Sequence, residues 1–223
     1  MTMRLMHSSI GRKTLMAFTG LILVFFVMGH LMGNLFIFLG PEALNAYALK
    51  LRHLGAGLWL VRGFLLLAVL VHIVTSIQLT SENRAARPVR YQRYHTAKAT
   101  LPSRTMILSG LLLLAYIAYH LLHFTFQTAH PEVAHLTTPQ GHHDVYRMVV
   151  LSFQQPSISF AYIAAMVLLF FHLRHGIASS VQSLGLNNER TLAIVERIGA
   201  GLSWALLLGY ISIPLAVLCG ILQ

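Results

Sequence analysis

The sequence predicts an all-α membrane protein with five transmembrane helices. Of its 223 residues, 56% are hydrophobic and 10% are charged, whereas charged residues make up about 25% of an ordinary soluble domain. A bilayer core of about 30 Å takes about 20 helical residues to cross, and five apolar stretches between charged segments have that length. The composition therefore excludes a soluble globular domain.

In chain order, these stretches predict spans from about Thr14 to Leu39, Leu58 to Leu79, Thr105 to Gln127, Ser157 to Ser180 and Ile198 to Leu222. The first is longer than the apolar segment of a signal peptide, about 7 to 15 residues, and it lacks a small-residue cleavage site. The longest connection, residues 128–156, is mostly polar and contains three prolines, which is typical of an irregular surface loop. Because no stretch remains for a soluble domain, we predict a single transmembrane domain over residues 1–223.

Lysine and arginine residues are distributed unequally between the two sides of the predicted bundle. Twelve fall on the side of the N-terminus and four on the other, so the positive-inside rule places the N-terminus in the cytoplasm. With five spans, the C-terminus is then outside. Because these bases flank apolar spans, the net charge of +10 indicates membrane orientation and not nucleic-acid binding. The twelve are Arg4, Arg12, Lys13, Arg84, Arg87, Arg90, Arg93, Lys98, Arg104, Arg174, Arg190 and Arg197; the four are Lys50, Arg52, Arg62 and Arg147.

Histidines on four of the spans fall at two depths. From the helical rise, His30 lies about 5 Å and His120 about 6 Å from the bilayer centre towards the outside. On the same arithmetic, His72 lies about 5 Å and His175 about 9 Å towards the cytoplasm. Each depth thus takes one histidine from each of two helices, which is what a haem with an imidazole on both faces of its iron requires. The depths predict two stacked haems b.

Other interpretations of these histidines remain open. A single histidine in an apolar helix is more often satisfied by a neighbouring helix than by a metal, although ionisable groups at membrane depth are usually functional. Imidazoles also suit zinc or a di-iron centre, but a di-iron membrane enzyme needs its histidine motifs at one aqueous face. Here "HLLH" (120–123) and "HLRH" (172–175) fall on opposite sides. The single cysteine, Cys219, excludes covalent C-x-x-C-H attachment, so any haem is held non-covalently.

Four stretches of the sequence carry a family resemblance. They are "TGLILVFFVMGHLMGNLFIFLGPEALNAYA" (19–48), "VHIVTSIQLTSENRAARPVRY" (71–91), "SGLLLLAYIAYHLLHFTF" (109–126) and "HLRHGIASSVQSLGLNN" (172–188). Together, in this order and over nearly the whole chain, they resemble the dihaem cytochrome b membrane subunit of succinate:quinone oxidoreductases and quinol:fumarate reductases.

The resemblance implies the axial ligands of both haems. It assigns His30 and His120 to the haem distal from the catalytic subunits, and His72 and His175 to the proximal haem. His172 and His175 lie three residues apart and so share one helix face; the spacing cannot choose between them. The family's ligand in an "HG" pair selects His175, which predicts that His175→Ala removes a haem while His172→Ala keeps both. The family pattern likewise favours His120 over His123, leaving His123 and His172 as haem neighbours.

Two glycines and an arginine cluster fit the same arrangement. Gly20 and Gly110 lie ten residues, about 15 Å, on the cytoplasmic side of His30 and His120, where a residue without a side chain lets the flat ring approach. Ordinary small-residue helix packing explains them equally well. The cluster is predicted to pair haem propionates, dock a partner or act only as a solvated orientation signal; it comprises Arg84, Arg87, Arg90 and Arg93.

The function implied by the resemblance is that of a membrane anchor and electron-transfer subunit. A flavoprotein subunit and an iron–sulfur subunit are expected on the cytoplasmic face of a bacterial inner membrane, because this chain has no nucleotide motif of its own. Electrons are expected to pass between the iron–sulfur subunit and menaquinone or menaquinol through the two haems. The alternatives are a cytochrome b subunit of a hydrogenase or formate dehydrogenase, and a haem-free proton channel or transporter.

The quinone site is the least specified part of the sequence. Quinone chemistry needs a proton donor or acceptor within hydrogen-bond reach, and the first outer loop offers Glu42 and His53, with Arg52 as an electrostatic aid. Some relatives have a glutamate, linked to transmembrane proton movement, two residues before the fourth-span ligand. The matching position here is Leu173, which puts that route of proton movement in doubt.

Overall fold

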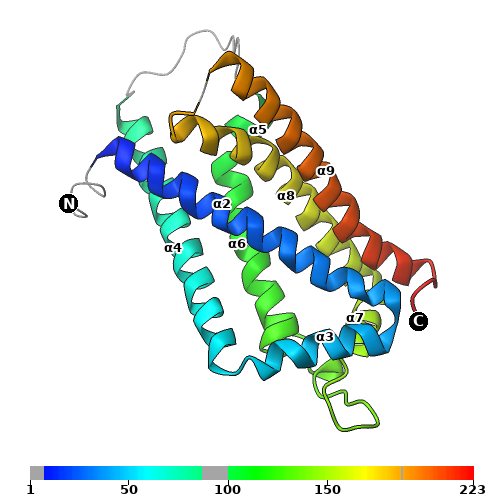
Figure 1. Ribbon diagram of the computed structural model, residues 1–223. Coiled ribbons are helices and arrows are strands. Elements are labelled where there is room, and N and C mark those ends of the chain that lie inside the picture. The colour runs from blue at the N-terminus through cyan, green and yellow to red at the C-terminus, as the bar shows by residue number, and fades with distance from the viewer. Residues whose placement is uncertain (1–7, 87–99, 187) are drawn as a thin grey trace. The chain divides into compact units, whose positions relative to one another are not determined.

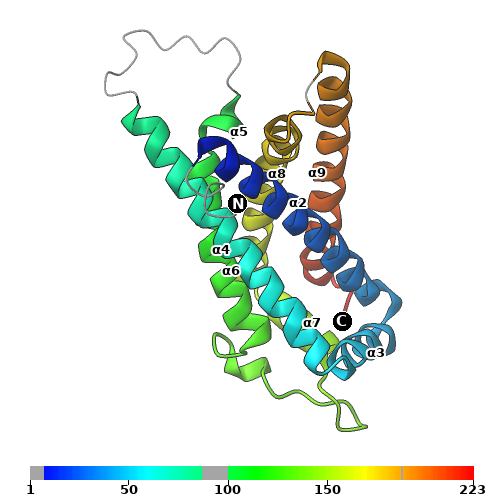
Figure 2. The ribbon, with the colours of Figure 1, turned by 60° about the vertical axis from the view of Figure 1, so that its left-hand side comes forward.

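The computed structural model describes residues 8–86, 100–186 and 188–223, and these residues are mostly helical (Figure 1). The basic residues Arg4, Arg87, Arg90, Arg93 and Lys98, which the sequence analysis assigned to orientation or partner docking, lie outside the described residues. The long helices, which can be followed in Figures 1 and 2, are α2 (Ser9–Asn34), α4 (Ala56–Ala85), α6 (Met106–His120), α8 (Pro156–Ser183) and α9 (Glu189–Leu218).

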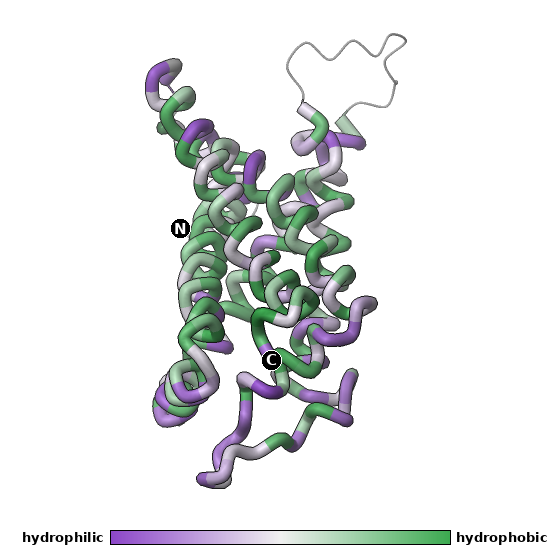
Figure 3. The backbone as a smooth tube through the Cα atoms, turned by 90° about the vertical axis from the view of Figure 1, so that its right-hand side faces the viewer, coloured by the Kyte–Doolittle hydropathy of each residue, from purple (hydrophilic) through white to green (hydrophobic). Residues whose placement is uncertain are grey.

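Five helical segments among the described residues are long and apolar enough to cross a membrane. They are Ser9–Leu39, Ala56–Ala85, Met106–Thr125, Pro156–Ser183 and Arg190–Leu218, so the predicted number of spans is confirmed, and each predicted span overlaps one of these segments. Helix α4 continues past the predicted end at Leu79, and α9 begins well before Ile198. The difference arises because helical hydrogen bonding continues through polar residues beyond the apolar stretch. Figure 3 shows this distribution, with hydrophobic residues along the helices and hydrophilic ones gathered in the connections.

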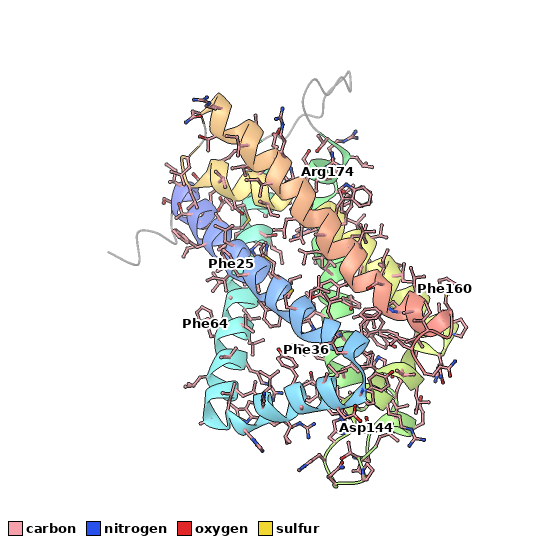
Figure 4. All side chains as sticks on the ribbon, turned by 45° about the vertical axis from the view of Figure 1, so that its right-hand side comes forward. Phe25, Phe36, Phe64, Asp144, Phe160 and Arg174 are labelled. Atoms are coloured by element: carbon pink, nitrogen blue, oxygen red, sulfur yellow. The ribbon has the colours of Figure 1, made fainter. Side chains whose placement is uncertain are left out.

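The spans carry large apolar side chains that no other part of the described chain covers. Phe25 is 70% exposed, Phe64 55% and Phe160 63% (Figure 4). Contiguous exposed apolar surface is rare on soluble monomers, whereas acyl chains of a bilayer cover it without cost. The exposed side chains therefore support the prediction of a multi-pass membrane protein.

The connections contain short helices that the sequence analysis did not predict. Helix α3 (Pro41–His53) begins after Gly40, whose φ of 99° favours glycine, and has proline in its first turn. Its first turn carries Glu42 and its last turn carries basic side chains, which matches the helix dipole. The predicted irregular loop contains the 3-10 turn η3 (Pro131–Val133) and helix α7 (Val145–Phe153), so only part of it is irregular.

Helices α3 and α7 are joined by one asparagine side chain. Asn45 donates to the carboxylate of Asp144 at 3.0 Å and accepts from the backbone N–H of Tyr146 at 3.0 Å. Asp144 also caps α7 by accepting from the Arg147 N–H. Asn45 of α3 thus satisfies the N-terminal end of α7.

The chain divides into two compact units, and each of the five spans contributes a segment to both. The first unit comprises the described parts of Met1–Phe26, Gly63–Leu111 and Phe171–Ser203. The second comprises Val27–Arg62, Leu112–Phe170 and Trp204–Gln223. An ion pair between Arg12 and Glu82 at 2.6 Å links α2 to α4 within the first unit. The second unit contains an apolar core that includes Ile37, Leu44, Val150 and Phe153.

Candidate functional site: two histidine pairs

The second unit brings together the two histidines predicted for the distal haem. His30 on α2 and His120 at the end of α6 have ring centroids 5.9 Å apart and planes at 85°. Aromatic rings enclose the pair, with Tyr116 5.9 Å and Tyr162 6.0 Å from His120, and Tyr210 6.3 Å from His30. Both imidazoles are only partly buried.

The first unit places His172, and not His175, against His72. The rings of His72 on α4 and His172 on α8 have centroids 6.5 Å apart, with planes at 65°. His175 lies one turn further along α8, and within the described residues no ring contact or hydrogen bond of its side chain is recorded. The predicted ligand His175 and the predicted neighbour His172 are therefore close in sequence but different in surroundings.

Hydrogen bonds fix which nitrogen of His72 carries the proton. Its Nδ1 lies 3.2 Å from the carbonyl oxygen of Met16 and 3.3 Å from the hydroxyl of Thr19. A carbonyl only accepts, and Thr19 already donates to the Leu15 carbonyl at 2.8 Å, so His72 Nδ1–H must be the donor. In the neutral ring this leaves the lone pair on Nε2, the form of imidazole that binds a metal.

The same logic applies to His172. Its Nδ1 lies 3.1 Å from the hydroxyl of Ser109 on α6, and Ser109 donates its own proton to the Met106 carbonyl at 3.1 Å. Ser109 therefore accepts from His172 Nδ1–H, and the Nε2 lone pair is again available. A metal-binding histidine commonly donates its other nitrogen to an acceptor of this kind, which orients the ring.

The two predicted glycines lie against these two imidazoles. A Cβ atom at Gly20 would stand 3.2 Å from Cε1 of His72, and one at Gly110 would stand 3.4 Å from Cε1 of His172. Each imidazole therefore meets a hydroxyl residue followed by a glycine, Thr19-Gly20 on α2 or Ser109-Gly110 on α6. The glycines make room for the imidazole rings, which is a more specific role than general helix packing.

In the second unit, His120 is held by a longer chain of hydrogen bonds. Ser152 donates to the Met148 carbonyl at 2.7 Å, so its oxygen must accept from His123 Nε2–H at 3.0 Å. His123 Nδ1 then accepts from the Tyr162 hydroxyl at 3.0 Å. With its proton used, the Tyr162 oxygen accepts from His120 Nδ1–H at 3.4 Å. His120 consequently has the same tautomer as His72 and His172, with Nε2 carrying the lone pair.

This chain also separates His120 from His123. The side chain of His123 is completely buried, and both of its nitrogens are hydrogen-bonded. It lies in the π-helical segment η2 (Leu121–Thr125) that continues α6, and such segments are frequent at functional sites. Of the two histidines that the sequence left open, His123 is thus occupied by its neighbours, and His120 is the one beside His30.

Histidine pairs of this kind fit a cofactor, such as haem, whose own atoms supply most of the ligands of its metal ion. Two imidazoles sharing one metal ion through bonds of about 2.0–2.1 Å have ring centroids roughly 6 Å apart, close to the 5.9 and 6.5 Å observed. In the part of the chain that the structure describes, no group of three or more histidine, cysteine, aspartate or glutamate side chains could hold a metal ion by itself. A haem iron needs only two axial ligands from protein, so the residues present fit that group.

The three residues predicted for a quinone site are not brought together. Glu42 lies in the first turn of α3, whereas Arg52 and His53 lie in its last turn, a separation of about 16 Å along the helix axis. All three side chains are exposed. Leu173, at the position where some relatives of the predicted family have glutamate, is buried with 7% exposure.

The connection before α8 contains titratable groups with defined partners. His143 donates from Nδ1 to the Leu136 carbonyl at 3.2 Å and contacts the amide nitrogen of Gln127 through Nε2 at 2.8 Å. Partial burial, and secondarily the charge of Arg52, lower the pKa of His143. The pKa of the exposed Glu132 is lowered by a hydrogen bond from its own backbone N–H and then by His130.

No protein-family model, curated protein or solved structure matches this chain. The family resemblance of its motifs therefore remains a prediction, and the site is argued from its own residues. Sequence reasoning missed Thr19, Ser109 and Tyr162, which orient the histidines. The first two immediately precede the glycines that it did single out, whereas nothing in the sequence distinguishes Tyr162 from other span tyrosines.

Proposed function

We propose that this chain is the membrane-anchor and electron-transfer subunit of a succinate dehydrogenase or fumarate reductase complex. In this proposal it spans a bacterial cytoplasmic membrane with its N-terminus inside. A flavoprotein subunit and an iron–sulfur subunit dock on its cytoplasmic face. Menaquinone or menaquinol is the redox partner within the membrane, and two haems b are the resident cofactors.

The observation that supports the proposal is the occurrence of one oriented histidine pair in each unit. His30 with His120 and His72 with His172 have the spacing of axial ligands. Three of these four rings have their Nδ1 protons assigned by acceptors that leave Nε2 available. Two independent pairs within five apolar spans are the arrangement that a dihaem membrane subunit needs.

The chain's own residues would hold and tune these centres. Haem b supplies one-electron chemistry at its iron when it is bound. The imidazoles would hold the haem iron, and Thr19, Ser109 and Tyr162 fix the orientation of three of them. The aromatic rings around His30 and His120 would limit the access of water to that centre, which would strengthen electrostatic interactions there.

We also propose His172 as the partner of His72. The "HG" motif favours His175, and that choice remains a prediction from the sequence. The geometry favours His172 because its ring lies beside His72 and its Nδ1 donates to Ser109. His175 lies at a similar depth and is the alternative ligand.

A haem-free proton relay is a second candidate, favoured by the hydrogen-bond chain from His120 through Tyr162 and His123. That chain ends on the Met148 backbone carbonyl, which has no proton to pass on. The arrangement therefore suits orientation of His120 better than proton conduction.

The test is a reduced-minus-oxidised spectrum of the purified chain, with pyridine haemochrome quantification. We expect two haems b per chain. A preparation that is folded and helical by circular dichroism but contains no haem would contradict the proposal and favour the proton relay. One haem per chain would contradict the assignment of two complete pairs.

A further inference from the structure

Three side chains in the second unit form a hydroxyl–imidazole–carboxylate series that the two histidine pairs do not use. The hydroxyl of Tyr119, on α6, lies 3.0 Å from Nε2 of His130. Nδ1 of His130 lies 3.1 Å from a carboxylate oxygen of Glu132. The series therefore runs from a transmembrane helix to the connection that follows it.

The carboxylate sets the direction of these hydrogen bonds. An ionised carboxylate only accepts, so His130 Nδ1–H donates to Glu132. In a neutral imidazole, Nε2 then carries the lone pair and accepts from the Tyr119 hydroxyl. This is the order in which a carboxylate orients an imidazole as a base for a hydroxyl proton.

The series reaches both water and the region of the His30 and His120 pair. The side chain of Glu132 is 52% exposed and that of His130 is 21% exposed. On the inner side, the ring of Tyr119 lies 5.9 Å from that of Tyr162, which donates to His123. The ring of His130 lies 4.5 Å from that of His123. A proton taken up at His130 therefore has a short path to water, close to the proposed redox centre.

We infer that His130, positioned by Glu132, is the proton acceptor and donor for a hydroquinone or quinone that reacts beside the second unit. This inference rests on the proposed function and adds to it the site of proton exchange. A substrate hydroxyl reaches Nε2 by taking the place of the Tyr119 hydroxyl, which otherwise donates to it.

The proton step balances without any further reactant. Oxidation of a hydroquinone releases two protons and two electrons. One hydroxyl O–H bond breaks, an N–H bond forms at Nε2, and the resulting imidazolium lies beside the carboxylate of Glu132. This proton then passes to water at the exposed edge of His130. The O–H bond of the other hydroxyl breaks as well, and its proton passes to water; quinone reduction reverses the sequence. The electrons are those that the proposed function already transfers.

At this site an acid–base residue is hydrogen-bonded to a carboxylate and to a hydroxyl, whereas the two acid–base candidates predicted from the sequence are not in contact with one another in the described chain. Glu42 and His53 lie at opposite ends of α3, and neither hydrogen-bonds to the other within the described residues. By contrast, His130 holds a carboxylate and a hydroxyl on its two nitrogens. The comparison favours the connection before α8 over the connection before α4.

The experiment measures haem reduction by a quinol in membranes that contain the full chain. The probe is reduced 2,3-dimethyl-1,4-naphthoquinone, and the haem α-band is followed by stopped flow. We expect His130→Ala to slow reduction about 100-fold, as the loss of a general base does, and added imidazole to restore part of the rate. Glu132→Gln should slow it about tenfold, because the base is still present but is no longer oriented.

The matched control is His135→Ala, which removes an exposed histidine from the same connection and should leave the rate unchanged. Dithionite, which needs no quinone site, should reduce every variant equally. If His130→Ala and Glu132→Gln both react as fast as His135→Ala, the inference is overturned while the proposed function stands. If dithionite but not the quinol reduces the wild-type chain, the proposed quinone function fails and the inference fails with it.

Discussion

In the first unit, His72 and His172 each donate directly to a hydroxyl that is anchored on a helix carbonyl. In the second unit, His120 donates into Tyr162, and two more side chains intervene before the series ends on a carbonyl. Both arrangements leave Nε2 available. They differ in how many side chains must be correct for one imidazole to keep its orientation.

The difference shows that two histidines with the same role can differ in how sensitive their orientation is to substitution of the residues around them. In the first unit the support of each imidazole is short. It depends on one hydroxyl for His172, on one hydroxyl and the Met16 carbonyl for His72, and in both cases on the glycine that admits the ring.

In the second unit the support of His120 is long and consists of Tyr162, His123 and Ser152. It depends on every member, because the direction of each hydrogen bond is fixed by the next hydrogen bond in the series. We therefore expect the second unit to respond to changes several residues away from its histidines, and the first unit to respond mainly to changes in direct contact.

The largest expected effect separates the two candidates on α8. His172→Ala should lower the haem content from two per chain to one, because His172 is the imidazole beside His72. His175→Ala should leave two haems, and His72→Ala should match His172→Ala. Pyridine haemochrome assays of the three variants check this. Loss of a haem in His175→Ala, with both retained in His172→Ala, would restore the choice made from the "HG" motif.

The next effect tests the long support of the second unit. Tyr162→Phe removes the acceptor of His120 Nδ1–H and should weaken haem binding there about 10–100-fold, as loss of such partners does at other metal sites. Tyr116→Phe is the matched control, because its ring lies 5.9 Å from that of His120 and no hydrogen bond of its hydroxyl is recorded in the described chain. Haem titration measures the affinity, and low-spin electron paramagnetic resonance reports the ligation of the haem iron. Identical behaviour of the two variants would contradict the directed series.

A smaller effect concerns the short support of the first unit. In Gly20→Ala, the new Cβ would lie 3.2 Å from Cε1 of His72, so the ring must shift by a few tenths of an ångström. We expect about a tenfold loss of haem affinity in the first unit, the lower end of the range for changes beside a metal-binding histidine. Gly63→Ala, where nothing lies within 4 Å, should have no such effect. Retention of full affinity by Gly20→Ala would show that His72 does not need this close approach.

The smallest effect is a pH dependence confined to the connection before α8. The folded-state pKa of His143 lies below its ordinary value, so the unfolded segment takes up a proton before the folded one does as pH falls below about 6.5. Protonation also removes the acceptor for the Gln127 amide. The protection factors of the amides over residues 135–144, which are corrected for the intrinsic pH dependence of hydrogen exchange, should therefore be lower at pH 5 than at pH 7. His143→Gln should abolish that difference, and an unchanged difference would assign it to another group.

The sequence predicted the spans well because a bilayer imposes a length on apolar segments. It missed α3 and α7, since short helices in polar connections have no such signal. The grouping of His30 with His120 followed from depth along a helix, which depends only on the rise per residue. The choice between His172 and His175 did not follow from the sequence, because two positions three residues apart share a helix face. Which of them lies beside His72 depends on how the neighbouring helices are placed.

Positioning residues were the part of the site that the sequence could not provide. Thr19 and Ser109 act across helices, so their role depends on which helices lie side by side. Tyr162 acts on His120 from a position forty-two residues further along the chain. Such contacts leave no periodic pattern, and an isolated hydroxyl in an apolar span is common for unrelated reasons.

The wide turn at Leu121–Thr125 closes with a hydrogen bond from the Phe126 N–H to the Leu121 carbonyl, five residues back. In an ordinary α-helix, His123 would follow His120 at about 100° per residue, whereas the wide turn changes the direction of His123 while Tyr162 still contacts both imidazoles. Deleting one residue from this turn would return the helix to its usual pitch and rotate everything beyond it by about 100°. At this end of the span, a change in chain length is therefore more disruptive than a change of side chain, and the phase of the helix is itself part of what keeps two nearby histidines in separate roles.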